Sequence, residues 1–245
     1  MNKVIHLSQT TSTNDYIKSV EQTHQIIVVT TQYQTKGRGQ SGAWISDQGQ
    51  NLLFSLKIQP DDIPASQGFI LSQANALALR DTLTAYLPEV SVKWPNDIYA
   101  DAKKICGTLI ENSLSGKNIH QCVIGTGINI NQVCFPPDLA APTTSLRLLT
   151  QRTIPVMQVL DDFLAHFQHY YTLVQDRNWQ TIRQQYHQSL YQRDVERLYA
   201  DHDGRFLGTI QMVEPDGHII ILDNQYSSER IVFSFYREGL FAIGY

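Results

Sequence analysis

The stretch HQCVIGTGINI at residues 120–130 is short, apolar and rich in β-branched side chains. Three more runs share this character: QIIVVTT at 25–31, NLLFSLKI at 51–58 and ICGTLIEN at 105–112. Short apolar runs with β-branched or aromatic side chains are typical of buried strands. The sequence therefore predicts that these four segments form the core of a sheet.

Helical segments accompany the predicted strands. Ser66 could cap a helix that runs to about Leu87, and Pro155 suits the first turn of a second helix. Between residues 156 and 174 apolar side chains recur at i, i+3, i+4 and i+7, a stripe wide enough to pack against a sheet. A shorter helix is expected at 179–186. Together these features predict an α+β fold.

The pattern changes from about residue 192 onward. Five short strand-like runs follow one another: RDVERLYA, RFLGTIQMV, HIIILDN, SERIVFSFY and GLFAIGY. Turn signals separate them at Asp203-Gly204, Asp216-Gly217 and Asp223-Asn224. Five strands in about 55 residues suggest a small antiparallel barrel, because closure removes exposed edges. We therefore expect one domain at residues 1–190 and a second, all-β domain at 191–245.

Composition excludes several classes of protein. The chain has 245 residues, of which 42% are hydrophobic and 17% charged, values typical of a soluble globular protein. Its 19 Lys+Arg and 23 Asp+Glu give a net charge of −4, which argues against a nucleic-acid partner. No apolar run approaches the ~18 residues that span a bilayer, and the first residues lack the apolar core of a secretory signal. Three cysteines without CxxC spacing fit a reduced, cytoplasmic protein.

A glycine-rich loop, TKGRGQSG at 35–42, follows the first predicted strand. Its three glycines let the backbone approach a ligand closely and present N–H groups to an anion. Arg38 offers a planar fork for carboxylate or phosphate, and Trp44 could stack on a purine or a hydrophobic ring. An ordinary surface turn is the stronger interpretation of the loop alone, because it matches neither a P-loop nor a dinucleotide fingerprint.

The stretch KWPND at 93–97 has a different character. A strand brings in Lys93, and Pro95 ends that strand and fixes a turn from which Asn96 and Asp97 project side chains that can form local hydrogen bonds. Lys93 can act as a point charge for phosphate, and Asp97 as a base or a ligand of a hard cation. A purely structural interpretation, a Pro-Asn-Asp turn beside a buried Trp, is also plausible by itself.

Three further segments carry weaker signals. In KKICG at 103–107, a lysine enters a strand whose glycine leaves room alongside, although lysine pairs are usually solvated. The glycines of GTGININ at 125–131 mark either close approach by a ligand or a bulge. Ser12-Thr13-Asn14-Asp15 is most simply a helix N-cap, whose hydroxyls could also bond to a ureido or amide ligand.

Taken together, the segments place Arg38, Lys93 and Lys104 beside glycine-bearing strands. They include no Ser/His/Asp set, no Cys/His pair and no metal-ligand spacing. Such a site suits an anionic, phosphate-bearing ligand that is held by positioning and electrostatics.

In order and spacing, these segments resemble the biotin–protein ligase family. The resemblance covers about residues 6–131 and includes the Ser-Thr-Asn start, Gln34 with the GRG loop, KWPND, K-I-C-G and GTGINI. It implies a mixed-sheet catalytic domain of the biotin/lipoate ligase, class II synthetase-like type, followed by a small SH3-like β-barrel. Because only eleven residues precede Ser12, we expect a monofunctional form without a helix-turn-helix domain and without operator binding.

The resemblance implies a two-step reaction, that of a biotin–[acetyl-CoA-carboxylase] ligase. The biotin carboxylate attacks the α-phosphate of ATP, which gives biotinyl-5′-AMP and pyrophosphate. A lysine of the biotin carboxyl carrier domain of a biotin-dependent carboxylase then takes the acyl group and releases AMP. Mg²⁺ usually accompanies such a nucleotide. The GRG loop is expected to fold over the adenylate.

The resemblance also implies roles for individual residues. Biotin-binding positions are Ser12, Thr13, Asn14, Gln34, Gly37, Arg38, Gly39, Gln40, Lys104 and Gly107. ATP-binding positions are Arg38, Trp44 (stacked on adenine), Lys93, Asn96 and Asn129. Catalytic roles fall to Arg38, Lys93, Lys104 and Asp97, the last by orienting or deprotonating the incoming lysine. Metal ligands stay unassigned. Gln40 and Ala43 replace arginines that are common in the family's loop, which predicts a changed adenine geometry and weaker affinity for the adenylate.

Three alternatives remain open. A lipoate or octanoate transferase shares the fold, but is expected to lack KWPND and the GRG loop. A non-catalytic biotin- or nucleotide-sensing module would not need a cation that stabilises a transition state, yet three candidate cations are present. A protein-interaction module built around the C-terminal barrel is the third. The sequence leaves open which carboxylase is the acceptor and whether the protein forms a homodimer.

Overall fold

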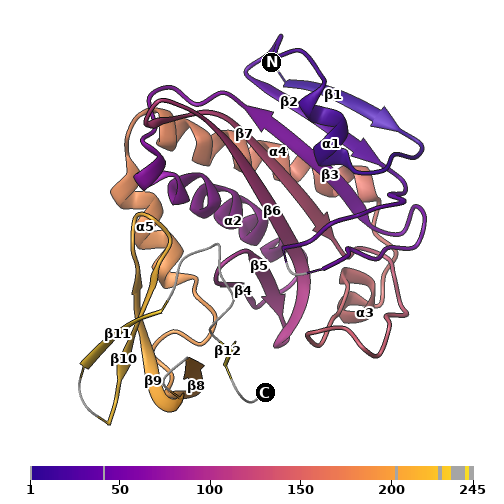
Figure 1. The fold of residues 1–245 in the computed structure, drawn as a ribbon. Coiled ribbons are helices and arrows are strands. Elements are labelled where there is room, and N and C mark those ends of the chain that lie inside the picture. Colours follow the sequence, from indigo (N-terminus) through magenta and orange to yellow (C-terminus); the bar gives the residue numbers. More distant parts are fainter. Residues whose placement is uncertain (1, 41, 202–203, 226–227, 233–240, 243–245) are drawn as a thin grey trace.

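The computed structural model describes residues 2–40, 42–201, 204–225, 228–232 and 241–242. A seven-stranded sheet with helices on both faces occupies the first part of the chain, and a five-stranded sheet follows it (Figure 1). The predicted α+β fold with a β-rich C-terminal part is therefore confirmed. The domain limits, 1–190 and 191–245, stay predictions.

The first sheet is mixed and has the strand order β1-β2-β3-β7-β6-β5-β4. Its strands are β1 (Asn2–Leu7), β2 (Ile26–Thr31), β3 (Leu52–Ile58), β4 (Val90–Lys93), β5 (Asp97–Ala100), β6 (Lys103–Ser115) and β7 (Asn118–Ile128). β1 and β2 are parallel, and every other neighbouring pair is antiparallel. The four apolar runs are β2, β3, β6 and β7, and they lie side by side in the middle of the sheet.

Side chains of the central strands alternate between two apolar layers. Ile27 and Val29 of β2 pack with Ile17 of the short helix α1 (Thr13–Lys18). Ile26 and Val28 belong instead to the main core on the opposite face. Because both faces are covered, all residues of β2 and β3 are buried, which explains their nearly continuous apolar sequence.

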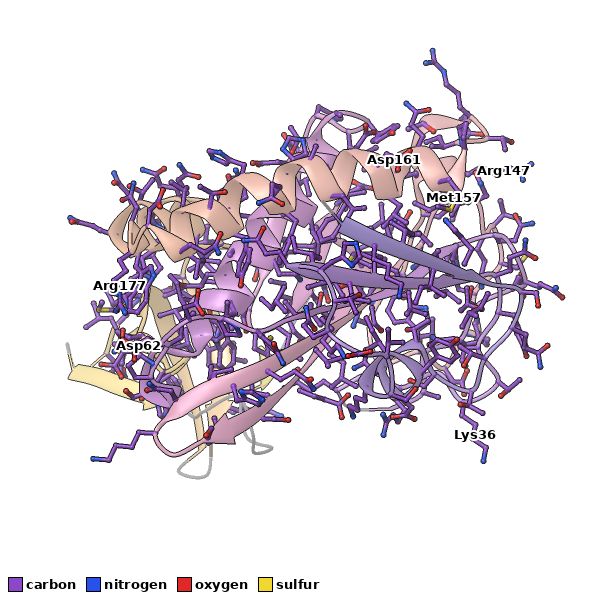
Figure 2. The ribbon with its side chains drawn as sticks, turned by 90° about the horizontal axis from the view of Figure 1, so that it is seen from above. Lys36, Asp62, Arg147, Met157, Asp161 and Arg177 are labelled. Atoms are coloured by element: carbon purple, nitrogen blue, oxygen red, sulfur yellow. The ribbon has the colours of Figure 1, made fainter. Side chains whose placement is uncertain are left out.

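Three longer helices cover the main-core face of the sheet: α2 (Phe69–Thr84), α4 (Val156–Gln175) and α5 (Trp179–Gln188). A short helix, α3 (Leu146–Thr150), lies between β7 and α4. Seen from above, α4 runs along the outside of this layer (Figure 2). The Arg177–Asp62 ion pair, 2.9 Å long, lies near the end of α4.

The predictions for α4 and α5 are confirmed, because α4 starts directly after Pro155 and α5 starts at Trp179. The prediction that Ser66 caps the first long helix is wrong. Ser66 lies inside a 3₁₀ turn (Ala65–Gln67), Gly68 occupies the N-cap position, and α2 ends at Thr84. A Cβ at position 68 would lie 2.7 Å from Ile119 Cδ1, so close packing against β7 explains the glycine at this position.

The second sheet is antiparallel with the order β11-β10-β9-β8-β12. Its strands are β8 (Arg197–Asp201), β9 (Gly204–Val213), β10 (Ile219–Asp223), β11 (Ser228–Val232) and β12 (Phe241–Ala242). Each predicted run contains a strand, although Asp203 and parts of the last two runs lie outside the described residues. Among those residues the strands pair as an open series, so closure of the barrel stays a prediction.

The turn between β9 and β10 packs against the first domain. Trp94 Nε1 donates a hydrogen bond to the Gly217 carbonyl at 2.9 Å. A Cβ at Gly217 would lie 2.8 Å from the Phe69 ring, and its φ of +98° also favours glycine. The second sheet therefore contacts the KWPND turn. No helix within the described ranges combines the length and apolar character needed to cross a bilayer.

Candidate functional site

One cavity gathers most of the residues singled out from the sequence. It lies between the N-terminus of α1, the glycine-rich loop, the first half of β6 and the C-terminal end of β7. The predicted residues in its lining are Ser12, Thr13, Asn14, Gln34, Arg38, Gly39, Gln40, Trp44, Asn96, Lys104 and Gly107. Lys36, just before the glycines, points to solvent on the side of the sheet opposite α4 (Figure 2).

The strand glycines make room for side chains of the chain itself. A Cβ at Gly125 would lie 2.1 Å from Asn14 Oδ1. A Cβ at Gly127 would lie 2.3 Å from the Trp44 indole, and one at Gly107 would lie 2.9 Å from it. Close approach, rather than a bulge, therefore explains these glycines, and the approaching groups are two residues of the cavity lining.

The Ser-Thr-Asn segment forms a buried, hydrogen-bonded wall. Ser12 is the N-cap of α1 as predicted, yet its side chain makes no capping bond. Gln34 Oε1 accepts from the Thr13 backbone N–H at 2.7 Å and from its hydroxyl at 3.0 Å. Asn14 Nδ2 donates to Glu111 Oε2 at 2.8 Å. Segments some 20 and 100 residues apart in sequence thus hold one another in place.

Acidic side chains surround the guanidinium of Arg38. Arg38 Nη2 lies 2.6 Å from Asp15 Oδ1 and 3.9 Å from Glu111 Oε2, and Lys18 Nζ also pairs with Glu111 at 2.8 Å. Burial tends to raise the pKa of Glu111, but hydrogen bonds from Lys18 and Asn14 and the nearby cations outweigh it and lower the pKa. Arg38 is half exposed, so these carboxylates leave it accessible to a ligand.

The loop that carries Arg38 is closed by its own backbone. Gly39 N donates to the Gly42 carbonyl at 2.6 Å, and Trp44 N donates to the Gly37 carbonyl at 3.0 Å. A Cβ at Gly37 would lie 2.6 Å from the Trp44 carbonyl oxygen, which explains a glycine there. Ser41 lies outside the described residues.

A second charged group lies where β5 and β6 pair. Lys104 Nζ contacts Asp97 Oδ1 at 2.7 Å. Lys93 Nζ lies 3.2 Å from the Tyr99 hydroxyl and 4.8 Å from the centre of its ring. Burial raises the pKa of Asp97 against the opposing effect of both lysines, and burial lowers the pKa of Lys93. Two cations and one carboxylate therefore share a partly desolvated region.

Some predicted residues lie outside the cavity lining. Asn129 is buried, and its side-chain nitrogen donates to the Thr144 carbonyl at 3.1 Å, so the structure gives it a role in holding the loop after β7. Lys93, Asp97 and Gly37 lie behind or beside the lining. Asn96 lines the cavity with its amide fixed, because Nδ2 donates to the Thr108 carbonyl at 2.6 Å.

Two buried polar atoms of the lining have no hydrogen-bond partner in the described part of the chain. They are Trp44 Nε1 and the Thr126 hydroxyl. Buried polar atoms are normally paired, so these two mark positions where a ligand can donate or accept. Sequence reasoning assigned no role to Thr126, Ser55, Asp15 and Glu111. Their contacts depend on how α1 packs on the sheet and on which strand side chains face it, and local sequence does not reveal either.

Comparison with known proteins identifies the family. The model of the Biotin/lipoate A/B protein ligase family matches residues 6–129, half of the chain. The chain belongs to this family. The matched segment contains every residue of the cavity lining, from Ser12 to Gly127.

Curated relatives within the family are moderately similar. The bifunctional ligase/repressor BirA of Bacillus spizizenii is 27% identical over 208 residues, which are 83% of this chain and 63% of that protein. The biotin--[acetyl-CoA-carboxylase] ligase of Mycobacterium tuberculosis is 30% identical over 125 residues, which are 49% of this chain and 44% of that protein. The chain thus spans less than two thirds of the length of the curated relatives it matches.

Solved structures of the family confirm the fold. The biotin protein ligase from Aquifex aeolicus in complex with biotin and ATP superposes with a TM-score of 0.80 at 23% identity, covering 98% of this chain and 99% of that one. The Leishmania major enzyme in complex with biotinyl-5-AMP gives 0.64 at 20% identity, over 95% and 99%. At these identities the likeness establishes architecture alone.

Proposed function

We propose that this chain activates biotin with ATP to biotinyl-5′-AMP and transfers biotin to a lysine of a biotin carboxyl carrier domain. The observation that supports this most is the lining of a single cavity. It joins a neutral wall (Thr13, Asn14, Gln34) to two cations (Arg38, Lys104). Relatives named biotin ligases, and neighbours solved with biotin, ATP or biotinyl-5-AMP, agree with this arrangement.

The neutral wall suits the ureido ring of biotin. That ring offers two N–H donors and one carbonyl acceptor, and the wall presents hydroxyl and amide groups of both kinds. The open Thr126 hydroxyl and the Trp44 N–H add unused hydrogen-bonding capacity close by. In the proposal Trp44 forms a flat wall for a ring of the ligand.

The cations suit the first chemical step. A biotin carboxylate oxygen forms a bond to the α-phosphorus, and the bond to the β,γ-pyrophosphate breaks. Both reactants are anionic, so Arg38 and Lys104 offset their repulsion, while Lys93 stabilises charge on the phosphates in the transition state. Arg38 already binds a carboxylate, that of Asp15, and the substrate would replace it.

The second step needs a neutral amine. The lysine nitrogen of the carrier domain attacks the acyl carbon, the bond to AMP breaks so that AMP leaves, and the amine gives up one proton to solvent. Asp97, whose pKa is raised by burial, lies 2.7 Å from Lys104 and would orient that amine. No protein nucleophile is required, because holding the amine and the adenylate in a reactive geometry accelerates the transfer.

A resident Mg²⁺ does not fit the cavity. Among the described residues, the group of three possible ligands is Glu214, Asp216 and His218, in the β9–β10 turn and outside the cavity lining. Near the cavity, Asp97 is paired with Lys104, and Asp15 with Arg38. In the proposal Mg²⁺ therefore arrives as part of the nucleotide substrate.

Biotin-dependent exchange between ATP and pyrophosphate tests the proposal. The purified chain should incorporate labelled pyrophosphate into ATP when biotin is present and should fail to do so with lipoate. Exchange with lipoate alone would show the transferase alternative. If neither biotin nor lipoate supports exchange, the proposed ligase activity is contradicted.

A further inference from the structure

We propose that Ser55 is a positioning residue for biotin recognition, an inference that rests on the function proposed above. Ser55 lies in the middle of β3, is fully buried and is not part of the cavity lining. Its Oγ lies 2.7 Å from Thr13 Oγ1 and 2.6 Å from Asn14 Oδ1. It therefore acts through two residues that do line the cavity.

The amide of Asn14 is held at both ends. A carboxylate can only accept, so Glu111 Oε2, 2.8 Å away, fixes which end of the amide is the nitrogen. The Ser55 hydroxyl then donates to the oxygen at the other end. Gly125, which pairs with Ser55 across β3 and β7, provides the space that the amide fills. Three distant segments thus set the orientation of one amide.

The same hydroxyl reaches the second wall residue. Ser55 has one hydroxyl proton, which it donates to Asn14 Oδ1, so toward Thr13 Oγ1, 2.7 Å away, its oxygen acts as the acceptor. The Thr13 hydroxyl also lies 3.0 Å from Gln34 Oε1 and shares its one proton between these two oxygens. Ser55 is thereby the link between Asn14 and the Thr13–Gln34 pair. Without it, Asn14 Oδ1 loses a buried donor and the wall loses its fixed pattern of donors and acceptors. Binding of a neutral ring suffers, whereas Lys93 and Lys104 keep their contacts with Tyr99 and Asp97.

Ser55→Ala tests the inference through the split between KM and kcat. In the exchange assay the KM for biotin should rise about tenfold, while kcat and the KM for ATP stay within about twofold. Thr30→Val is the matched control. Thr30 is buried on the neighbouring strand β2, and its hydroxyl donates to the Leu53 carbonyl at 3.0 Å. Equal rises of KM in both variants would show general destabilisation and would overturn the proposal.

A double-mutant cycle tests whether Ser55 acts through Asn14. In an Asn14→Ala background, adding Ser55→Ala should raise the KM for biotin by clearly less than in the wild type, and the remaining change passes through Thr13. Effects that multiply would overturn the inference. If Ser55→Ala does not fold, Ser55→Cys, with a thiol that is a weaker donor, should raise the KM severalfold, and an unchanged KM would overturn it.

Failure of the inference is distinguishable from failure of the proposed function. Wild-type chain that exchanges with biotin, together with a Ser55→Ala variant of normal KM, contradicts only the role of Ser55. Wild-type chain without exchange contradicts both.

Discussion

Two groups of side chains, in the cavity lining or next to it, are built in opposite ways, and we call them the neutral end and the charged end. The neutral end, formed by Thr13, Asn14, Gln34 and Ser55, is a set of uncharged groups whose hydrogen bonds join them to one another. The charged end, formed by Arg38, Lys93, Asp97 and Lys104, contains cations that contact carboxylates or a hydroxyl of the same chain. One end is fixed before a ligand arrives, whereas the other must exchange its partners.

This difference assigns different tasks to the two ends. Groups that are already oriented favour binding, because a ligand need not order them. Cations that meet negative charge as it develops favour the chemical step. We therefore expect substitutions at the neutral end to change the KM for biotin, and substitutions at the charged end to change kcat.

Removing Lys104 should have the largest effect. Lys104→Ala takes away a cation of the cavity lining and leaves Asp97 without its ion-pair partner, so kcat for exchange should fall about 100- to 1,000-fold. Lys103→Ala is the control, because Lys103 is exposed and pairs with Asp101 on the surface at 3.3 Å. If the two variants have similar kcat values, Lys104 has no role in the chemical step.

Lys93 should contribute less and only to the rate. Lys93→Ala should lower kcat about 10- to 100-fold, because a charge near the phosphates is lost, and should leave the KM for biotin within about threefold. Steady-state exchange kinetics with varied biotin measure both values. A large rise in that KM with normal kcat would mean that the division between the two ends is wrong.

The charged end should also set the alkaline limb of the pH profile. Burial lowers the pKa of Lys93, so this group loses its charge at a lower pH than an ordinary lysine, and the rate falls as pH rises through that pKa. Lys93→Arg keeps its charge at high pH and should move the limb upward. An unmoved limb would assign the titration to another group.

Freeing Arg38 should have the smallest effect. Asp15→Asn removes the carboxylate that competes with the substrate for Arg38, so the KM for biotin should fall about two- to fivefold. At high salt the fall should be smaller, because salt screens the exposed Arg38–Asp15 pair. Asp161→Asn, on α4 far from the glycine-rich loop, is the control (Figure 2). A higher KM for Asp15→Asn would show that Asp15 positions Arg38 rather than competing for it.

The sequence alone predicts the parts of the fold that rest on local pattern. The four central strands are continuous apolar runs, and α4 carries a regular apolar stripe, so both were recognisable. β1 and the exact start of α2 were not. The position of Gly68 depends on contact with Ile119, a residue about 50 positions away that local sequence does not reveal.

The sequence indicated the segments that form the site, but not the contacts between them. Motif resemblance indicated which residues to bring together, and Thr13, Arg38 and Lys104 do line one cavity, while their roles stay predictions. It could not indicate Ser55, a lone polar residue in an apolar strand. The role of Ser55 depends on two features of the folded chain: it pairs with Gly125 of β7, and its hydroxyl faces Asn14 of α1. The role of Asn129 as a nucleotide contact stays a prediction, and in the structure its side-chain nitrogen donates to the Thr144 carbonyl.

A crystal structure of the chain with bound biotinyl-5′-AMP is the most direct test of the division between the two ends. We predict that Thr13, Asn14 and Gln34 keep their present hydrogen bonds and contact the ureido ring. Arg38 should leave Asp15 and lie with Lys104 within hydrogen-bond distance of the acyl-phosphate. An adenylate bound with Arg38 still on Asp15 and Lys104 turned away from the phosphate would contradict the account.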